Sequence, residues 1–442
     1  MKKNRIGQSL LGFGGFLALM IFMPGSSTME VFAREADTPP DLEGRELILE
    51  AAIDLALQFN PGLKVFSAAE NEALARAEQA GRGLNPELGL EVENFIGSGD
   101  YSGFSSAEYT LFLTQTFQLG GKLSKQREAA GWNAETVQLE ARLQALDLQA
   151  QVTRVFVEIL TAQQEVSLAR ELVRLAEQDL EFVERRVKKG STSPVEISRA
   201  QVALYSARMV HDSSRQALKI KKIQLSTLWN TTTPTFGIAS GSLESVQPVP
   251  EWEELIHRLD QSPRLKRMEL EAGRRRAELA VLRSQGKIDL TASAGIRHFG
   301  NGGDNAAVAA ITIPLPVHNR NQDGIRAGQY GLDQVDALRQ TQLVTLREDL
   351  AEQHEQMTTA YIQVTTIRDE ILPASEQALT QTNVAYRKGL FTLTDVISVR
   401  RTWFELSSRY FTALATYQSA AVEMARILGE QEPNKLNPLE KD

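Results

Sequence analysis

The sequence of 442 residues contains no cysteine and only five histidines. The absence of cysteine excludes a disulfide framework, a thiolate metal site, a cysteine nucleophile and a lipid-modified N-terminal cysteine. The histidines stand singly, and phosphate-binding loops, dinucleotide fingerprints and nucleophile elbows are missing. We therefore predict that the protein is not an enzyme and holds no cofactor and no resident metal. A transient metal contact at His298 or His318 stays open.

Basic residues are too few for a nucleic-acid partner. The chain has 48 Lys and Arg against 56 Asp and Glu, with a formal net charge of -8, whereas phosphate binding depends on clustered cations. With 42% hydrophobic residues, the chain is nevertheless too apolar to be disordered. We therefore expect a folded protein that does not bind nucleic acid.

Long apolar runs are scarce as well. The 14-residue run at 10–23 follows three basic residues and precedes a stretch of small residues that ends at Ala33. This order is typical of a secretory signal peptide, and the run falls short of the about 20 residues that a membrane-spanning helix needs. We predict that residues 1–33 are a signal peptide and that the mature protein is exported.

The remaining sequence repeats one pattern. Two amphipathic segments reach Pro61 and Pro263, and two lysine-glycine pairs end at Gly190 and Gly389. The prolines are 202 residues apart and the glycines 199, which indicates one internal duplication. We divide the chain into a first repeat at 34–245, a second repeat at 246–429 and a C-terminal tail at 430–442.

Most of each repeat has helical periodicity. Apolar residues recur at steps of three and four from 152 to 187 and from 343 to 385, which predicts long helices with knobs-into-holes packing. One continuous helix over 122–189 would be about 100 Å long. We expect Pro373 to kink the second long helix.

Four short stretches alternate instead with a period of two. We predict strands at about 87–95 and 107–117 in the first repeat, and at about 288–297 and 306–315 in the second. Alternation over about ten residues is typical of membrane β-strands. A barrel needs about eight strands, so we expect protomers to share one barrel. A soluble four-stranded sheet covered by helices is the alternative.

The strand exits carry the most specific sequences. They are QTFQLGGK at 115–122 and IPLPVHNRNQ at 313–322. With the two lysine-glycine turns, they resemble the TolC-type outer-membrane efflux protein family, in particular its CzcC-like (cobalt-zinc-cadmium resistance) branch. The resemblance covers about 47–428. It implies a mainly α fold with a small β part, in which the duplicated helix, two-strand and hairpin units form a trimeric 12-stranded β-barrel plus an α-helical barrel.

The resemblance also implies a function. The protein would be an unlipidated homotrimer in the lipid of the cell outer membrane, with its helical tunnel in the periplasm. It would serve as the exit duct of a tripartite efflux system for divalent heavy-metal cations, with a periplasmic adaptor (membrane fusion) protein and an inner-membrane resistance-nodulation-division pump. A drug or type I secretion duct of the same fold stays open, as does an exported periplasmic coiled-coil scaffold or adaptor.

The same resemblance assigns roles at the two turns. Gly190 and Gly389 would be the periplasmic tips of two helical hairpins, where Lys189 and Lys388 join them in docking the adaptor. Glu196, Asp395 and Tyr386 would form the periplasmic aperture or gate, the acids lining it and the tyrosine bonding across protomers.

The residues themselves suggest a second role for these acids. Ser193 with Glu196, and Thr392 with Asp395, have the spacing of capping boxes, which is compatible with a place at the aperture.

One position departs from the family pattern. Phe391 stands where the family has its latch arginine, which puts a simple salt-bridge lock in doubt. Arg400 and Arg401 are possible substitutes, but we favour the interpretation that both lie on a solvated helix face.

Overall fold

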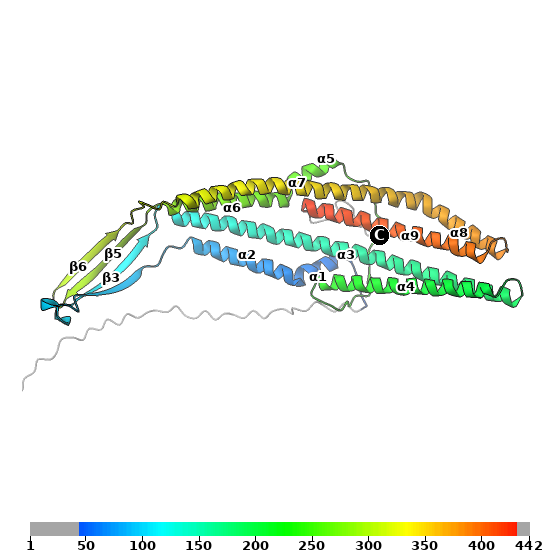
Figure 1. Ribbon diagram of the computed structural model, residues 1–442, viewed down its shortest axis with the longest axis horizontal. Coiled ribbons are helices and arrows are strands. Elements are labelled where there is room, and N and C mark those ends of the chain that lie inside the picture. The colour runs from blue at the N-terminus through cyan, green and yellow to red at the C-terminus, as the bar shows by residue number, and fades with distance from the viewer. Residues whose placement is uncertain (1–43, 431–442) are drawn as a thin grey trace, which may run out of the picture. The chain divides into compact units, whose positions relative to one another are not determined.

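The computed structural model describes residues 44–430, which form part of one structural unit. The predicted signal peptide and residues 431–442 of the predicted tail lie outside the described residues. Two short strands, β1 (Glu46–Leu47) and β4 (Ile238–Ala239), pair in parallel. The other elements follow one order twice (Figure 1).

The first copy of this order comprises α1 (Leu49–Phe59), α2 (Pro61–Ala80), β2 (Glu87–Glu93), β3 (Glu108–Phe117), α3 (Lys122–Lys188) and α4 (Val195–Thr227), with 3-10 turns η1 (Gly99–Tyr101) and η2 (Phe104–Ser106) between the strands. The second copy comprises α5 (Trp252–Asp260), α6 (Pro263–Gln285), β5 (Leu290–Phe299), β6 (Asn305–Thr312), α7 (Gln322–Thr366), the π-helical turn η3 (Ile367–Ile371), α8 (Leu372–Arg387) and α9 (Leu393–Leu428).

The second helix of each copy begins with the same local chemistry. The Asn60 side chain accepts hydrogen bonds from the backbone N–H groups of Gly62 and Leu63, at 2.8 and 3.3 Å. In the second copy the Ser262 hydroxyl accepts from the N–H of Leu265 at 3.4 Å. A proline follows each cap, where its missing N–H removes no helical hydrogen bond.

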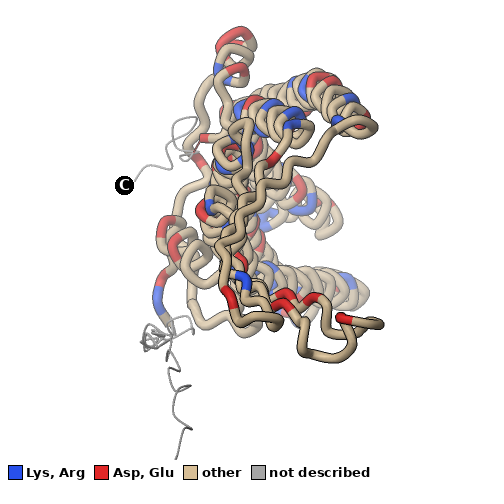
Figure 2. The backbone as a smooth tube through the Cα atoms, turned by 90° about the vertical axis from the view of Figure 1, so that its left-hand side faces the viewer, with Lys and Arg blue, Asp and Glu red and all other residues tan. Residues whose placement is uncertain are grey.

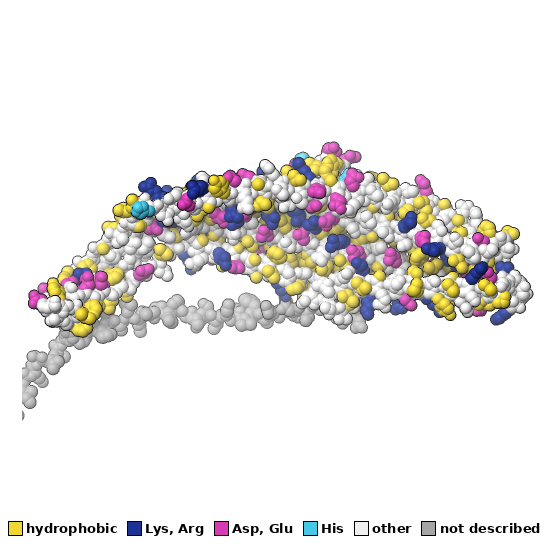
Figure 3. Space-filling view, viewed as in Figure 1, with side chains coloured by type: hydrophobic (Ala, Val, Ile, Leu, Met, Phe, Trp, Pro, Cys, Tyr) yellow, Lys and Arg dark blue, Asp and Glu magenta, His cyan; other side chains and the backbone are white. Residues whose placement is uncertain are grey.

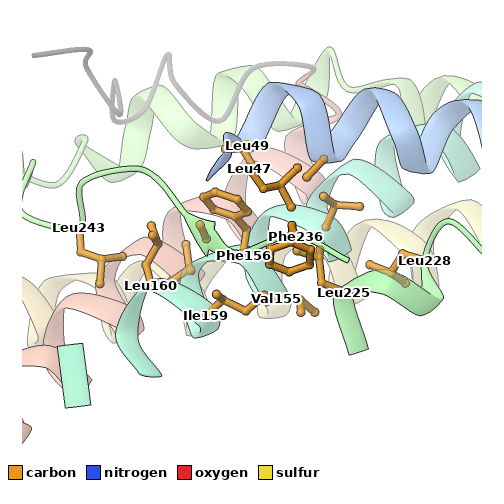
Figure 4. Close-up of a cluster of buried hydrophobic side chains, with 14 of the residues drawn as sticks. Leu47, Leu49, Val155, Phe156, Ile159, Leu160, Leu225, Leu228, Phe236 and Leu243 are labelled. Carbon is orange, nitrogen blue, oxygen red and sulfur yellow. The ribbon is translucent and has the colours of Figure 1, made fainter. Parts of the chain in front are cut away.

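Helix α3 is continuous over 67 residues, as predicted, which corresponds to about 100 Å. It packs against α2, α4, α6 and α9. Phe156 and Ile159 are buried among Leu47, Leu225 and Phe236 (Figure 4). None of the helices within 44–430 is both long and apolar enough to cross a membrane.

The second long helix is interrupted close to Pro373. The π-helical turn η3 ends two residues before this proline, and the chain bends where α7 passes into α8 (Figure 1). Proline cannot donate to the carbonyl four residues earlier, and its ring crowds that carbonyl. A wider turn relieves both constraints, so the irregularity precedes the proline.

The four longer strands form one antiparallel sheet in the order β2-β3-β5-β6. Within the described chain, β2 and β6 are its unpaired edges. Side chains of cross-strand partners lie on the same face of a sheet. On one face of this sheet they are apolar and exposed. This face includes Leu88, Leu90, Leu111, Leu113, Ile296 and Ile311.

The opposite face of the sheet is polar near its hairpin loops. Arg297 donates to Glu93 at 2.7 Å, to Glu108 at 3.0 Å and to the Thr110 hydroxyl at 2.9 Å. Acidic residues gather at this end (Figure 2). The two faces therefore differ in the way expected of a strand that separates lipid from water.

Strand bounds differ from the predicted ones where side chains intervene. β5 begins at Leu290 rather than 288, because the Asp289 carboxylate accepts from Lys122 at 2.8 Å and from the Leu119 N–H at 3.1 Å. β6 ends at Thr312 rather than 315, since Pro314 follows closely and cannot donate to a strand ladder. β2 ends at Glu93 because Asn94 is left-handed, with φ 55°.

Candidate functional site

The two helical hairpins end in tight glycine turns at the end remote from the sheet (Figure 1). Gly190 and Gly389 have φ of 66° and 78°, in the left-handed region that favours glycine. After each glycine the next N–H bonds back into the helix, from Ser191 to the Arg186 carbonyl at 2.8 Å and from Leu390 to the Ala385 carbonyl at 2.9 Å. Both turns thus have the hydrogen bond of a Schellman helix end.

The tips expose cationic and apolar side chains together. Lys189 and Lys388 are exposed beside the glycines. Leu390 and Phe391 are exposed as well, Leu390 by 74%. The tip of the second hairpin is therefore more apolar than its lysine-glycine sequence suggests.

The predicted capping box at Asp395 is confirmed. The Thr392 hydroxyl accepts from the Asp395 N–H at 3.3 Å, and the Asp395 carboxylate accepts from the Thr392 N–H at 2.8 Å. The carboxylate also accepts from the Thr392 hydroxyl at 2.7 Å. These bonds from the Thr392 side chain and backbone lower the pKa of Asp395, so it keeps its charge in mildly acidic solution.

The predicted capping box at Glu196 is wrong. The Ser193 hydroxyl accepts from the Val195 N–H at 3.3 Å, and no side chain caps the start of α4. The Glu196 carboxylate bonds to Arg199 at 2.8 Å instead. Pro194 lies directly before the helix, so α4 begins one residue later than the box requires and Glu196 is left in its first turn.

Tyr386 lies inside its own chain at the base of the hairpin tips. Its ring is 5% exposed and packs edge-on to Phe182, with ring centroids 5.3 Å apart. The Arg186 guanidinium lies 5.8 Å from the Tyr386 ring centroid. Burial raises the pKa of the Tyr386 hydroxyl, so it stays protonated and able to donate a hydrogen bond at neutral pH.

This tyrosine belongs to a small core that joins the two hairpins near their tips. The buried members come from α3, α4, α8 and α9, and the first residues of α9 are included. They are Val183, Ala200, Tyr386, Leu393 and Val396.

A buried ion pair lies beside this core. Arg400 of α9 is 5% exposed and bonds to Asp179 of α3 through both terminal nitrogens, one of them at 3.4 Å. It also donates to the Asn383 side chain of α8 at 3.4 Å. Burial raises the pKa of the Asp179 carboxyl, against the opposing effect of Arg400. The interpretation of a solvated helix face is therefore wrong for Arg400.

Arg401 fits that interpretation, since it is exposed and bonds to Glu405 at 2.8 Å. The difference between the two arginines follows from helical geometry, because neighbouring residues are about 100° apart on a helix. One arginine faces α3 and the next faces away.

Sequence reasoning missed Asp179, although its position carries a signal. A second apolar line on α3 runs through Leu168, Leu172, Leu175 and Phe182. Asp179 occupies the position that continues the steps of four and three between Leu175 and Phe182. A carboxylate in such a line implies a buried cationic partner.

A groove opens between α4 and α9 next to the tips. Its volume is about 920 Å³, and mostly apolar side chains line it, with Arg400 among them. Ala203 and Ala207 of α4 are among the lining residues, and their small side chains leave part of the space between the helices unfilled. The groove thus lies next to the starts of α4 and α9, which carry Glu196 and Asp395.

The described residues contain no group of three or more His, Cys, Asp or Glu placed to hold a metal ion. His298 lies near a strand loop, where its ring nitrogen is 3.1 Å from the Asn305 side chain. His318 lies between β6 and α7. These histidines are not brought together by the fold.

Comparison with known proteins finds one family that matches most of the described residues. The family described as "Outer membrane efflux protein" matches residues 52–231 and 257–430. The chain is 30% identical over 405 residues to the cobalt-zinc-cadmium resistance protein CzcC of Cupriavidus metallidurans, covering 92% of this chain and 94% of CzcC. It is 26% identical to the nickel-cobalt-cadmium resistance protein NccC of Alcaligenes xylosoxydans xylosoxydans, covering 70% of this chain and 67% of NccC.

Among solved structures, that of CusC superposes with a TM-score of 0.74 at 17% identity, covering 90% of this chain and 98% of CusC. The predicted mainly α, TolC-like fold class is thus confirmed.

The buried ion pair generates the first prediction. Asp179→Ala leaves the Arg400 charge buried and uncompensated, so we expect the free energy of unfolding to fall by about 3–5 kcal/mol. Asp179→Leu combined with Arg400→Met removes both charges and should recover most of this loss. Urea unfolding followed by far-ultraviolet circular dichroism measures both variants.

The exposed pair provides the control. Glu405→Ala removes the partner of Arg401 and should cost less than about 1 kcal/mol. Equal losses for Asp179→Ala and Glu405→Ala would contradict the burial of the Arg400 pair.

Proposed function

Since this chain belongs to the outer membrane efflux protein family, we propose that it is the exit duct of a tripartite efflux system for divalent heavy-metal cations. As a family member it is a transport channel of the outer membrane. Transport through such a duct needs no covalent step, only a continuous water-filled path and a gate with two packings.

The sheet carries the proposal of a shared pore. Its four strands have an exposed apolar face, a polar opposite face and two unpaired edges within the described chain. An isolated four-stranded sheet is too small to close, because a barrel needs about eight strands. Three copies would bring twelve strands together and pair every edge. We therefore propose a homotrimer.

We also propose where each part of the trimer lies. The apolar face of the sheet would contact outer-membrane lipid, and the helices would form a tunnel in the periplasm. Export by the predicted signal peptide at 1–33 fits this location, and the absence of cysteine supports the proposal of an unlipidated protein.

The hairpin tips are the proposed contact with a periplasmic adaptor protein, which in turn engages an inner-membrane resistance-nodulation-division pump. Gly190 and Gly389 hold the tight turns, and Lys189 and Lys388 supply charge next to them. The exposed Leu390 adds apolar surface. This combination suits a partner that presents acidic and apolar groups to the tips.

The relatives support the cargo. CzcC is named for resistance to cobalt, zinc and cadmium, and NccC for resistance to nickel, cobalt and cadmium. We propose that this chain also serves divalent metal cations. In an assembled trimer, Glu196 and Asp395 would place six carboxylates near the tips, which favours the passage of cations.

Tolerance to metals tests the cargo. A strain that lacks this protein should become sensitive to cobalt, zinc and cadmium, because the pump loses its exit from the periplasm. The full-length chain should restore growth, and growth inhibition by each metal and by several drugs is the measurement. Sensitivity to drugs alone would replace the metal cargo with a drug cargo.

Conductance in planar bilayers tests the aperture. Glu196→Ala with Asp395→Ala should lower the preference for cations over anions, because each chain then loses two carboxylates close to the tips. Since hydrogen bonds from Thr392 lower the pKa of Asp395, the part of the cation preference that Asp395 supplies should be lost only as the pH falls through that lowered pKa.

The matched control for conductance removes two carboxylates from α2, with Glu72→Ala and Glu78→Ala. These lie away from the tips and should leave the preference unchanged. An unchanged preference in the Glu196 and Asp395 variant would limit these residues to their roles at the helix starts.

Substitution at a tip tests docking. Gly389→Val forces a β-branched residue to a φ of 78°, so we expect trimers to form while metal tolerance is lost. The control is Gly303→Val in the β5–β6 loop, which has a φ of 77° and equally open surroundings. Equal effects of the two substitutions on tolerance would count against a docking role for the tip.

A further inference from the structure

The two ends of the β2-β3-β5-β6 sheet carry opposite charge. At the end with the hairpin loops, residues 91–110 and 297–305 contain five Asp and Glu against one Arg. At the other end, the four segments that join the sheet to the helices contain eight Lys and Arg against four Asp and Glu. These segments are 81–87, 118–128, 283–289 and 313–326. Figure 3 shows Lys and Arg side chains where the sheet passes into α7.

The apolar face of the sheet continues into the connection between β6 and α7. Ile311 belongs to that face within β6, and Ile313 and Leu315 continue its steps of two beyond the end of the strand. All three side chains are exposed, Leu315 by 78%. Val317 is 72% exposed. Exposed apolar side chains thus extend to the point where the cationic segments begin.

Three exposed cations lie beside this connection. Gly286 follows the last turn of α6, and it is so close to the Arg320 carbonyl oxygen that a Cβ atom would not fit between them. Arg283, in that last turn, and Lys287, directly after the glycine, therefore start from backbone positions close to Arg320. All three side chains are exposed. We call Arg283, Lys287 and Arg320 the junction cations.

The junction cations differ from their neighbours in having no carboxylate partner within the described residues. Lys122 pairs with Asp289, and Arg326 pairs with Asp323. These two ion pairs neutralise the cations next to the junction. The positive charge that remains exposed is therefore concentrated on the junction cations, where it can attract an anion.

One hydrogen bond connects this charge with the apolar surface. The Arg320 Nε donates to the Pro316 carbonyl at 3.1 Å. Pro316 stands between Leu315 and Val317 in the chain, so the guanidinium is held next to the most exposed apolar residues of the connection. A cationic group beside apolar side chains is the arrangement found where proteins meet the surface of a membrane.

We propose that the junction cations, with Leu315 and Val317, bind an acidic phospholipid in the leaflet that faces the periplasm. The cations contact the headgroup phosphate, and the two apolar side chains contact the adjoining part of the acyl chains. The inference deepens the proposed placement of the sheet in the outer membrane and rests on it.

Charge and apolar surface together select this ligand. Each Lys or Arg near a membrane surface favours an acidic lipid, whereas a free phosphate ion has no acyl chain for the exposed Leu315 and Val317 to contact. The five acids at the loop end of the sheet would repel an acidic headgroup there. The site therefore belongs to one leaflet only.

Fluorescence quenching tests this site, because the natural chain has no cysteine. A dye is attached to Val317→Cys in purified, membrane-extracted protein, and phospholipids with brominated acyl chains quench it on contact. In mixed micelles, phosphatidylglycerol should reach half-quenching at a concentration about tenfold or more below that of phosphatidylcholine. High salt should reduce this difference, because it screens the cations.

Two further dye positions calibrate the measurement. Leu111→Cys lies on the apolar face of the sheet and should be quenched equally by both lipids. Lys388→Cys lies at a hairpin tip and should be quenched by neither lipid. The three positions thus compare the junction with the lipid-facing surface and with the end remote from it.

Neutral variants separate the charge from the apolar contact. Arg283→Gln, Lys287→Gln and Arg320→Gln together should abolish the preference for phosphatidylglycerol at Val317 and leave quenching by phosphatidylcholine. Retention of the full preference in this variant would contradict the role of the junction cations.

The matched control removes three exposed arginines of α3 that lie 20 residues or more past its first residue. Arg142→Gln, Arg154→Gln and Arg170→Gln together change the net charge by the same amount and should keep the preference. Its loss in this control would assign the preference to overall charge and overturn the site.

The outcomes also separate this site from the proposed function. Equal half-quenching by the two lipids at Val317, or none there while Leu111 is quenched, would overturn the lipid site and leave the sheet in the membrane. No quenching at Leu111 by either lipid would overturn the placement of the sheet itself. Inorganic phosphate at constant ionic strength should leave the preference intact, and its loss would assign the cations to free phosphate instead.

Discussion

Burial of the apolar seam of α3 is the contact on which the other elements depend. α2, α4, α6 and α9 all pack on this one helix, and Phe156 and Ile159 are almost completely buried at its middle. A helix of this length gains most of its stability from tertiary packing rather than from intrinsic propensity. Helix α3 thus holds the two hairpins and the sheet at fixed distances from one another.

Polar side chains determine how the linker between the repeats lies on the long helices. The Gln163 side chain of α3 bonds to both backbone groups of Ala239, each at 2.9 Å. The Gln418 amide of α9 donates to the carbonyls of Leu243 and Ser245 at 3.1 and 3.0 Å. The linker between the repeats is therefore fastened to both hairpins. We interpret the Asp179–Arg400 pair in the same way, as a device for register rather than for net stability, because desolvation offsets much of the attraction within a buried pair.

The two ends of the protein differ in structure, although both are built from the same duplicated sequence pattern. At the sheet, the short strands leave an apolar face exposed and, within residues 44–430, two edges unpaired. At the tips, left-handed glycines end long helices within very few residues, and the helix starts that follow carry carboxylates in two different settings. Asp395 is held by its own cap, whereas Glu196 is paired with Arg199. The duplication thus provides two similar but chemically distinct hairpins.

The sequence by itself determined the long helices, the four strands and the glycine tips, because period, proline and glycine act locally. It also predicted the cap at Asp395, which depends on residues three positions apart. Tertiary structure alone decided that Arg400 is buried, because this burial depends on its ion pair with Asp179, 221 residues away. The tertiary structure likewise decided that Tyr386 packs on Phe182. It also decided that the Asp289 carboxylate bonds to Lys122 and lies outside the strand predicted to include it. Those outcomes depend on which faces of distant elements pack together. The side chains of both elements determine that packing jointly, so neither segment predicts it alone.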